Sequence, residues 1–476
     1  MYFASALPEI IILTFACLSL LADCFLKKHF RQINYYIAQT ALILAALASI
    51  KLLNFPTVYT YSGMFSLDPI STLLKLFIYI TSFFSFLYAR AFFETEKNIS
   101  VAEYYVLGLF SVLGMMVMLS SENLIPLFLG LEILSLPLYA MIALKRHNAI
   151  SAEAAMKYFI MGSFASAMLL YGMSLLYGLT QSLNIHEIAN VFSQGMTTHN
   201  LVFACAIVFI VSGIAFKLGA APFHVWAPDI YHGAPSIMSL FLGSAPKIAI
   251  LGLTFKLLIQ AMPDLQLQWR PLLILVALLS MGLGNIVAVA QTNLKRMLAY
   301  SSIAHMGYMS LGLIAGNQEG YAACIFYIFT YALMTLGGFA MISILSKSGI
   351  EAESIADFKG LNSKSPWLAF LMLLLMFSMA GVPPTVGFFA KLGVLTALVN
   401  VNLVWLATVA LIFAIIGAYY YIAVIKAMYF ESESTPNPLP IIPLDAKIAI
   451  STNALLLLFL GFSPGFLFQL CQRVLI

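Results

Sequence analysis

Long apolar runs separated by short polar segments set the hydrophobic pattern of this chain. A helix that crosses a bilayer needs about 20 consecutive, mostly apolar residues. Fourteen such runs follow one another, at residues 5–26, 33–54, 68–90, 103–120, 123–144, 153–180, 200–222, 236–260, 270–290, 297–315, 320–346, 366–390, 402–429 and 446–468. The strands of a β-barrel would instead alternate apolar and polar residues. The pattern therefore predicts an all-α polytopic membrane protein with about fourteen transmembrane helices.

Prolines interrupt two of these runs. One run continues past residue 222 through Pro222, Pro228 and Pro235, and another contains Pro383 and Pro384 in its middle. A proline inside a helix removes a backbone hydrogen bond and kinks or breaks the helix. We therefore expect both helices to be broken inside the membrane, where the freed backbone groups can face a polar or charged side chain.

The broken runs mark an internal repeat. Two blocks of the chain each contain five runs, the broken run is the fourth of five in both, and each broken helix carries a lysine, Lys217 or Lys391. Because a block with an odd number of helices reverses its orientation when it is repeated, this order predicts an inverted repeat. The predicted organisation is an N-terminal three-helix segment, two inverted five-helix repeats and a C-terminal helix, at residues 1–100, 101–260, 270–429 and 430–476.

The composition agrees with a membrane location and excludes several functional classes. Hydrophobic residues make up 62% of the 476 residues and charged residues only 9%, against about 25% charged residues in soluble domains. A water-soluble enzyme, a disordered chain and a disulfide scaffold are thereby excluded. The net charge of +4 gives no reason to expect a nucleic-acid partner, and the five cysteines show no metal-binding spacing. The sequence predicts a chain in the lipid bilayer without a cofactor or metal of its own.

Basic residues between the runs predict the orientation, because loops rich in lysine and arginine stay in the cytoplasm. If the N-terminus is outside, the cytoplasmic loops hold thirteen basic residues: Lys27, Lys28, Arg31, Arg90, Lys97, Lys145, Arg146, Lys295, Arg296, Lys347, Lys359, Lys364 and Lys447. The opposite side holds only Arg270 and Arg473. We therefore expect both termini on the outer side.

A carboxylate lies in the middle of the fifth run. Glu132 is too far from either end of that run for its side chain to reach the membrane surface. An ionisable group near the bilayer centre costs at least about 2.5–3.5 kcal/mol, so it needs a functional or a structural reason. The structural alternative is an ion pair that joins two helices, although buried ion pairs are weak stabilisers. We interpret Glu132 as a candidate proton carrier.

Three buried lysines complete the main candidate site. Lys217 precedes the first break, Lys247 lies near the middle of its run, and Lys391 follows the double proline. Burial lowers the pKa of a lysine and a nearby carboxylate raises it again, so such a lysine can gain or lose a proton. An arginine would stay protonated. The residue types therefore predict proton translocation by these lysines together with Glu132.

Weaker candidates for a proton relay lie in the same runs. His224 lies in the first break and Asp229 on the segment after it, while Tyr300 and His305 lie on the run of the second block that corresponds to the Glu132 run. A histidine changes charge near neutral pH, which suits a relay. A hydrogen-bonded core histidine explains His224 equally well.

Three further lysines lie nearer to the ends of their runs. Lys75 and Lys426 can either reach the membrane surface or function inside the membrane. Lys256 is expected to extend its ammonium group to the outer surface while its aliphatic part stays in the apolar layer.

Three stretches give the chain a close resemblance to a known family. They are Leu131–Tyr139, Phe216–Asp229 and Gly381–Lys391, the last with the pattern Val-Pro-Pro-x-x-Gly-Phe. Over essentially its whole length the chain resembles the antiporter-like membrane subunits of proton-pumping NADH-quinone oxidoreductase (respiratory complex I), a family related to Mrp-type sodium/proton antiporters. The lysine that ends the third stretch favours the subunit N branch over the M branch. The lack of a long C-terminal extension with a lateral helix argues against the L branch.

The resemblance implies a function and a division of labour. It implies that Glu132 pairs with Lys217, that Lys247 continues the proton path and that Lys391 ends it. It also implies that NADH, FMN, iron–sulfur clusters and quinone are bound by other subunits of the translocase, and that this chain has no redox centre. The expected partners are the antiporter-like subunit M and the small subunits K and J. The expected location is the bacterial inner membrane, with both termini periplasmic.

Two other functions would use the same residues. A stand-alone Mrp-like cation/proton antiporter would need the same lysines and carboxylate, and sodium dependence in isolated vesicles would distinguish it. A quinone-binding membrane subunit would use aromatic side chains and His224 to hold the quinone headgroup, and photoaffinity labelling by a quinone would reveal it. The resemblance favours the proton-pumping subunit over both.

Overall fold

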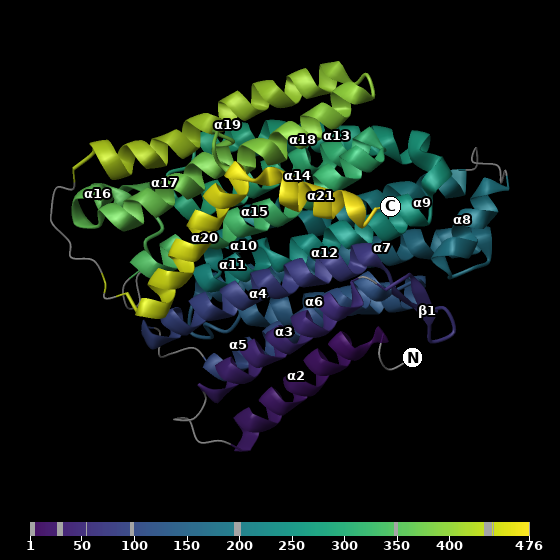
Figure 1. The fold of residues 1–476 in the computed structure, drawn as a ribbon, viewed down its shortest axis with the longest axis horizontal. Coiled ribbons are helices and arrows are strands. Elements are labelled where there is room, and N and C mark those ends of the chain that lie inside the picture. Colours follow the sequence, from purple (N-terminus) through teal and green to yellow (C-terminus); the bar gives the residue numbers. More distant parts are fainter. Residues whose placement is uncertain are drawn as a thin grey trace. The chain divides into compact units, whose positions relative to one another are not determined.

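The structure, a computed structural model, describes residues 5–25, 32–53, 55–95, 100–194, 201–346, 351–432, 440 and 442–475. Figure 1 shows that helices make up almost all of this part of the chain, together with a short β-hairpin. Twelve helical segments of the described part are long and apolar enough to cross a membrane. The predicted all-α polytopic architecture is thereby confirmed.

Two predicted runs are not among these twelve, and the structure shows why. The run at 297–315 forms α14 (Leu294–Ala315), a continuous helix whose polar residues lower its mean hydropathy. The run at 366–390 is split into α17 (Pro366–Ala380) and α18 (Val386–Asn400), so its second half extends beyond the predicted end. The last predicted run is too long, because Pro464 begins a separate helix there.

The helices pack into two compact units. Unit 1 comprises residues 1–86, 99–218 and 245–275, and unit 2 comprises residues 87–98, 219–244 and 276–476. Helix α4 (Pro69–Thr95) contributes to both units. The four-part division predicted from the apolar runs is a different partition of the chain and stays a prediction.

Unit 1 contains the β-hairpin and a set of long helices. Besides the first part of α4, its elements are α2 (Leu7–Phe25), α3 (Ile33–Leu52), β1 (Val58–Thr60), β2 (Phe65–Leu67), α5 (Val101–Ser120), α6 (Leu124–Ile142), α7 (Ala149–Thr180), α8 (Ile185–Ser193), α9 (Leu201–Leu218), α12 (Ala245–Thr254), the π-helix η2 (Phe255–Gln260), the 3-10 helix η3 (Pro263–Leu265) and the start of α13 (Gln266–Val289). The two strands pair antiparallel, with Val58 opposite Leu67. Their three residues each are too few for the alternation that identifies a strand in a sequence.

A close backbone contact joins α5 and α6 in this unit. A Cβ atom added at Gly114 of α5 would lie 2.3 Å from the backbone nitrogen of Leu134, and one added at Gly130 of α6 would lie 2.6 Å from that of Met118. Glycines permit such an approach because they carry no side chain. The contact fixes α6, and with it Glu132, against α5.

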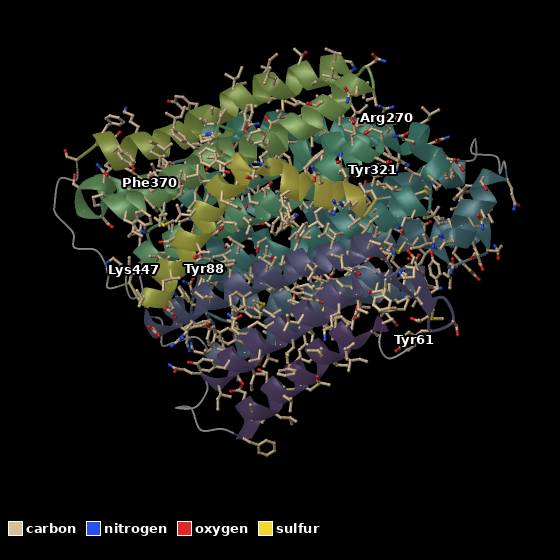
Figure 2. The ribbon with its side chains drawn as sticks, viewed as in Figure 1. Tyr61, Tyr88, Arg270, Tyr321, Phe370 and Lys447 are labelled. Atoms are coloured by element: carbon tan, nitrogen blue, oxygen red, sulfur yellow. The ribbon has the colours of Figure 1, made fainter. Side chains whose placement is uncertain are left out.

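Unit 2 is arranged around α15 (Gln318–Leu345), which is almost entirely buried. The other elements are the end of α4, α10 (Trp226–Gly233), α11 (Ser236–Gly243), most of α13, α14, η4 (Ile355–Phe358), α16 (Leu361–Lys364), α17, α18, α19 (Val404–Phe430), α20 (Leu444–Phe462) and α21 (Pro464–Arg473). Helix α15 contacts α11, α14, α17, α18, α20 and α21. At the end of α4, Tyr88 accepts a hydrogen bond from Asn453 of α20 at 3.5 Å (Figure 2).

One backbone junction occurs in both units. The amide and carbonyl partners are Leu124 with Leu183 and Ile185 with Glu122 in unit 1, and Leu294 with Glu353 and Ile355 with Thr292 in unit 2. Each residue of the second set is numbered 170 higher than its counterpart in the first, as 294 against 124 and 355 against 185 show. The two blocks therefore share a local structure, while their inverted orientation stays a prediction.

Candidate functional site

The candidate carboxylate lies on α6 of unit 1. This helix begins after Asn123, whose side chain accepts a hydrogen bond from the Ile125 amide, so Glu132 falls near the middle of the helix. The Glu132 side chain is partly buried, and its Oε1 atom is buried without a hydrogen-bond partner among the described residues. Leaving a buried acceptor unpaired is costly. This oxygen is therefore available to bind a proton.

Lys217 reaches the same face of α6 from another helix. It lies in the last turn of α9, and its Nζ donates a hydrogen bond to the Ser135 Oγ at 3.0 Å. The Ser135 hydroxyl donates in turn to the carbonyl of Leu131 at 2.8 Å. Since residues three apart lie side by side on a helix, Ser135 neighbours Glu132.

The expected pair of Glu132 and Lys217 is therefore indirect. Glu132 acts electrostatically on Lys217, but the hydrogen bond of the ammonium group goes to Ser135. Ser135 was not among the predicted site residues, although its position three residues after Glu132 indicated that both lie on one face of the helix. The role of Glu132 and Lys217 in proton transfer stays a prediction.

Helix α9 ends directly after Lys217, at Leu218. Gly219 has a φ of +70°, a left-handed conformation that favours glycine, and the next helix, α10, begins only at Trp226. The segment after the break belongs to unit 2 and contains His224. This histidine is half-buried, and its Nδ1 atom is buried without a hydrogen-bond partner in the described part of the chain. The relay role of His224 therefore stays a prediction.

Lys247 occupies a different place in its helix from the one predicted. The run at 236–260 is interrupted at Ser244, whose φ of −113° and ψ of −93° are not helical, and α12 begins at Ala245. Lys247 therefore lies in the first turn of a short helix, where its side chain is only 2% exposed. The N-terminal end of a helix carries a partial positive charge, so a cation is disfavoured at this position.

Lys391 lies on α18 of unit 2 and reaches back across the second break. Its Nζ donates hydrogen bonds to the carbonyls of Met379 at 3.1 Å and Ala380 at 2.8 Å, the last residues of α17. Gly381, with a φ of +84°, ends α17 there. The carbonyls at the end of a helix lack helical partners and carry a partial negative charge, so they stabilise a cation.

The Lys391 and Lys217 sites differ in construction. Lys217 precedes its break, whereas Lys391 follows its own break and bonds to the helix before it. The Nζ of Lys391 also lies 5.2 Å from the centre of the Tyr308 ring. This geometry suits a cation–π contact.

His305 lies at the centre of a hydroxyl network in unit 2. Its Nδ1 lies 2.7 Å from the Tyr327 Oη, and its Nε2 lies 3.2 Å from the Tyr421 Oη. Tyr421 is hydrogen-bonded to Ser301 of the same helix as His305. His305 is therefore a buried histidine with a phenol partner at each ring nitrogen. Its relay role stays a prediction. Neither tyrosine stood out in the sequence, because tyrosines are frequent throughout the chain.

The two remaining relay candidates have different surroundings. Tyr300 is only partly buried, and the hydrogen bonds described for the His305 network do not include it. Asp229 forms an ion pair with Arg296 at 3.2 Å, and both side chains are about one-third exposed. An exposed ion pair of this kind explains Asp229 without a relay function, so relay roles for both residues stay predictions.

The expectation for Lys256 is wrong, and Lys75 does not reach the surface, which was one of its two alternatives. Lys256 is buried and bonded to Glu122, Asp68 and Ser66, so its ammonium group does not extend to the surface. Lys75 is also buried, and its Nζ lies 2.5 Å from Glu9. Both lysines pair with carboxylates inside the protein. These partners are far away in the sequence, so the sequence alone did not indicate them.

Lys426, by contrast, is mostly exposed, with Glu431 at 3.9 Å. Its ammonium group therefore lies at the surface, which was one of the two alternatives.

These groups share the ability to exchange protons. Lysine, carboxylate, imidazole and phenol groups can each accept or donate a proton when a partner is within hydrogen-bond reach. Among the described residues, no group of three or more His, Cys, Asp or Glu side chains is placed to hold a metal ion. The arrangement favours proton transfer along side chains.

Comparisons with known proteins agree with the resemblance seen in the sequence. The family model for the transmembrane region of NADH:quinone oxidoreductase/Mrp antiporters matches residues 121–417. The chain is 54% identical to NADH-quinone oxidoreductase subunit N of Coxiella burnetii, over 98% of each chain. It is 50% identical to the subunit N of Thioalkalivibrio sulfidiphilus, over 98% of this chain and 97% of the relative.

Solved structures share the fold over nearly the full length. A chain of respiratory complex I from Thermus thermophilus with bound aureothin matches with a TM-score of 0.83 and 31% identity, covering 97% of this chain and 98% of that chain. A chain of the Mrp complex from Dietzia sp. DQ12-45-1b matches with a TM-score of 0.86 and 20% identity, covering 100% and 97%. The second likeness shows a similar fold alone.

Proposed function

Because the chain belongs to the subunit N family of NADH-quinone oxidoreductase, a proton-translocating membrane subunit, we propose that Glu132, Lys217, Lys247 and Lys391 carry its protons. The observation that carries this proposal is the hydrogen bond from the Lys217 ammonium to Ser135, beside Glu132 on α6. It places a partly buried amine next to a carboxylate that has an unpaired oxygen.

The first proton-transfer step uses the groups of unit 1. Glu132 takes up a proton at its unpaired oxygen, and the loss of its negative charge makes Lys217 readier to release a proton. Ser135 accepts a hydrogen bond from Lys217 while it donates one to a backbone carbonyl. A hydroxyl in this position holds the amine in place and can pass a proton by reorienting. Lys247, buried in the first turn of α12, is the next carrier.

The last step uses the groups of unit 2. Protonated Lys391 is stabilised by the two carbonyls at the end of α17 and by the Tyr308 ring. Its neutral form lacks the charge that these dipoles favour, so binding and release of a proton change how tightly the side chain is held. His305 and its tyrosine partners, together with His224, Tyr300 and Asp229, are candidate relay groups toward water.

The chain is one membrane subunit of a larger complex, whose cofactors are carried by other subunits. We propose that NADH, FMN, the iron–sulfur clusters and quinone are bound there, and that this chain receives only an electrostatic or conformational signal. The proposed neighbours are the antiporter-like subunit M and the small subunits K and J. The proposed location is the bacterial inner membrane with both termini in the periplasm, which the distribution of basic residues supports.

The test is proton pumping by the complete oxidoreductase, purified and reconstituted in lipid vesicles. Lys217→Met and Lys391→Met should each lower NADH-driven proton uptake by about tenfold or more, because a proton carrier is removed. The matched control is Lys157→Met, which removes an exposed lysine that pairs with Glu153 at 2.9 Å. This control should pump normally. Equal pumping by Lys217→Met and Lys157→Met, at equal complex yield, would show that Lys217 carries no protons.

A further inference from the structure

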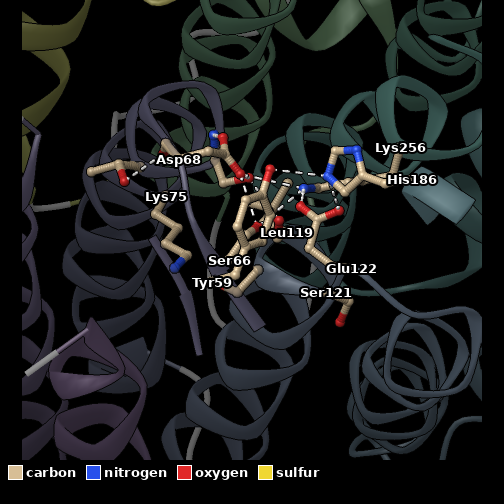
Figure 3. A network of polar contacts seen from close by, with 12 residues as sticks. Tyr59, Ser66, Asp68, Lys75, Leu119, Ser121, Glu122, His186 and Lys256 are labelled. Carbon is tan, nitrogen blue, oxygen red and sulfur yellow. Dashed lines mark hydrogen bonds and ion pairs between the residues drawn. The ribbon is translucent and has the colours of Figure 1, made fainter. Parts of the chain in front are cut away.

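A second charged cluster lies in unit 1, formed by residues outside the proposed proton path (Figure 3). Its centre is Lys256 of η2, whose Nζ lies 2.5 Å from Glu122 Oε1 and 3.3 Å from Asp68 Oδ2. The other carboxylate oxygen of Glu122 lies 3.3 Å from the Nε2 of His186. The same nitrogen lies 3.0 Å from the Tyr59 hydroxyl. We define Asp68, Glu122, His186 and Lys256 as the hairpin cluster.

The hairpin cluster joins four segments that are distant in sequence. Asp68 follows strand β2 and caps α4, Glu122 lies in the turn between α5 and α6, His186 lies on α8, and Lys256 lies on η2. The side chains of Glu122 and Lys256 are each 3% exposed, whereas that of His186 is 49% exposed. His186 is therefore the member through which the cluster can exchange protons with water.

The charges of the hairpin cluster balance only in one protonation state. Two carboxylates face one permanently buried ammonium group, which leaves one negative charge uncompensated. A proton on His186 cancels that charge. The charged groups that act on this histidine are Glu122, Lys256 and Asp68. An uncompensated charge in a buried cluster is unfavourable. The buried groups therefore favour the protonated imidazole.

We propose that the hairpin cluster is a proton-binding site, and that its bound proton fastens the β1–β2 hairpin, the α5–α6 turn and α8 to η2. The ligand is a proton from the aqueous phase. Uptake forms an N–H bond on His186, and release breaks that bond and returns the proton to water. When the proton leaves, the cluster gains a net negative charge and its segments separate more readily. This role is independent of the lysines that carry translocated protons.

The electrostatics of His186 and its buried partner Glu122 agree with this assignment. The contact with the Glu122 carboxylate raises the pKa of His186 above its ordinary 6.5, although burial acts in the opposite direction. Burial would raise the pKa of Glu122, but the contact with His186 and the Lys256 charge lower it to about 2. The His186 contribution is complete below pH 6.5 and is lost as the pH rises through its raised pKa. The Glu122 contribution is complete above pH 4.5 and is lost only as the pH falls toward 2.

Unit 2 contains a cluster of the same composition. The Lys295 ammonium lies 2.9 Å from Glu351 and 3.6 Å from Glu353, and the Nε2 of His232 lies 3.3 Å from Glu353. Lys295 is buried, whereas the His232 side chain is 37% exposed. This cluster adjoins the unit 2 copy of the backbone junction, just as Glu122 adjoins the unit 1 copy. The recurrence of two carboxylates, one buried lysine and one accessible histidine supports a shared role.

Amide hydrogen exchange of the complete oxidoreductase in lipid nanodiscs tests the proposal. The amides of Glu122, Leu124 and Ile185 donate to carbonyls of neighbouring segments and report on their separation. After correction for the intrinsic exchange rate, their protection should fall about tenfold between pH 6 and pH 9 in the unchanged protein. In His186→Gln, protection should be low at every pH.

A second substitution separates charge balance from simple damage. Glu122→Gln leaves one carboxylate for one ammonium, so protection should be high and independent of pH both alone and combined with His186→Gln. The amides of Leu294 and Ile355 in unit 2 are the internal control, and the His186 and Glu122 changes should leave them unaltered. Protection that is flat with pH in the unchanged protein, or a double variant as unprotected as His186→Gln, would overturn the proposal.

Discussion

At the scale of single residues, the candidate site depends on a serine rather than on a direct ion pair. Ser135 holds the Lys217 ammonium beside Glu132 without neutralising either group. A direct ion pair of a lysine and a glutamate would hold its proton strongly, because each charge stabilises the other. Because the Lys217 ammonium bonds to a neutral hydroxyl and not to the carboxylate, both groups can change protonation state, which a proton carrier requires.

Removing the Ser135 hydroxyl should weaken pumping without abolishing it. Ser135→Ala takes away the acceptor of the Lys217 hydrogen bond, so the amine loses its fixed position but keeps its charge. We expect proton uptake by reconstituted vesicles to fall less than in Lys217→Met. The control is Ser166→Ala on α7, since the Ser166 hydroxyl is buried without a hydrogen-bond partner among the described residues. If Ser135→Ala pumps as well as Ser166→Ala, the hydroxyl has no part in proton transfer.

At the scale of helices, close contacts and breaks place the candidate groups. The α5–α6 contact fixes the position of Glu132, and the end of α17 supplies the carbonyls that hold Lys391. Both features depend on glycines, Gly114 at the contact and Gly381 at the break. Glycines therefore determine the position of α6 beside α5 and the end of α17.

Gly114→Ala should destabilise the membrane domain. The added methyl group would lie 2.3 Å from the Leu134 backbone nitrogen, so α5 and α6 must move apart. Overpacking of this kind costs about 1–3 kcal/mol. Gly178→Ala on α7 is the control, because no heavy atom lies within 4 Å of the added Cβ. We expect a lower thermal unfolding midpoint and lower complex yield for Gly114→Ala only, and equal midpoints would refute the packing argument.

The sequence predicted the helices and the breaks better than it predicted the partners of charged residues. Apolar runs and prolines act locally, so the interruptions near Pro222 and Pro383 were visible in the chain itself. The partners of Lys256 are not local, since Asp68 and Glu122 are more than a hundred residues away. The break at Ser244 was missed although it has local signals, since Gly243 ends α11 directly before it and Pro246 lies in the first turn of α12.

At the scale of the whole molecule, orientation in the membrane follows from charges in the loops. The excess of basic residues on one side predicts residues 145–147 in the cytoplasm and residues 181–199 outside. The described part of the second segment includes α8 and with it His186, one member of the hairpin cluster. In this predicted orientation, we expect His186 to exchange protons with the periplasm.

Thiol labelling in sealed vesicles tests this orientation. In a background in which the exposed Cys17 and Cys24 are replaced by serine, Ser193→Cys should react with an impermeant thiol reagent from the periplasmic side. His147→Cys should react only in inverted vesicles. Labelling of Ser193→Cys from the cytoplasmic side alone would reverse the topology and remove the basis of the predicted inverted repeat.

The backbone junction found in both units encloses the same number of residues in each. Asn123 and Asn184 form a bridge in unit 1, and Asn293 and Ser354 form one in unit 2, with the same number of residues between each pair. We infer from this equal length that the two blocks descend from one duplicated segment. Counting 170 residues on from Glu132 and Ser135 leads to Ser302 and His305. The spacing of these polar positions is thus the same in both blocks, while a carboxylate and a hydroxyl in the first correspond to a hydroxyl and an imidazole in the second.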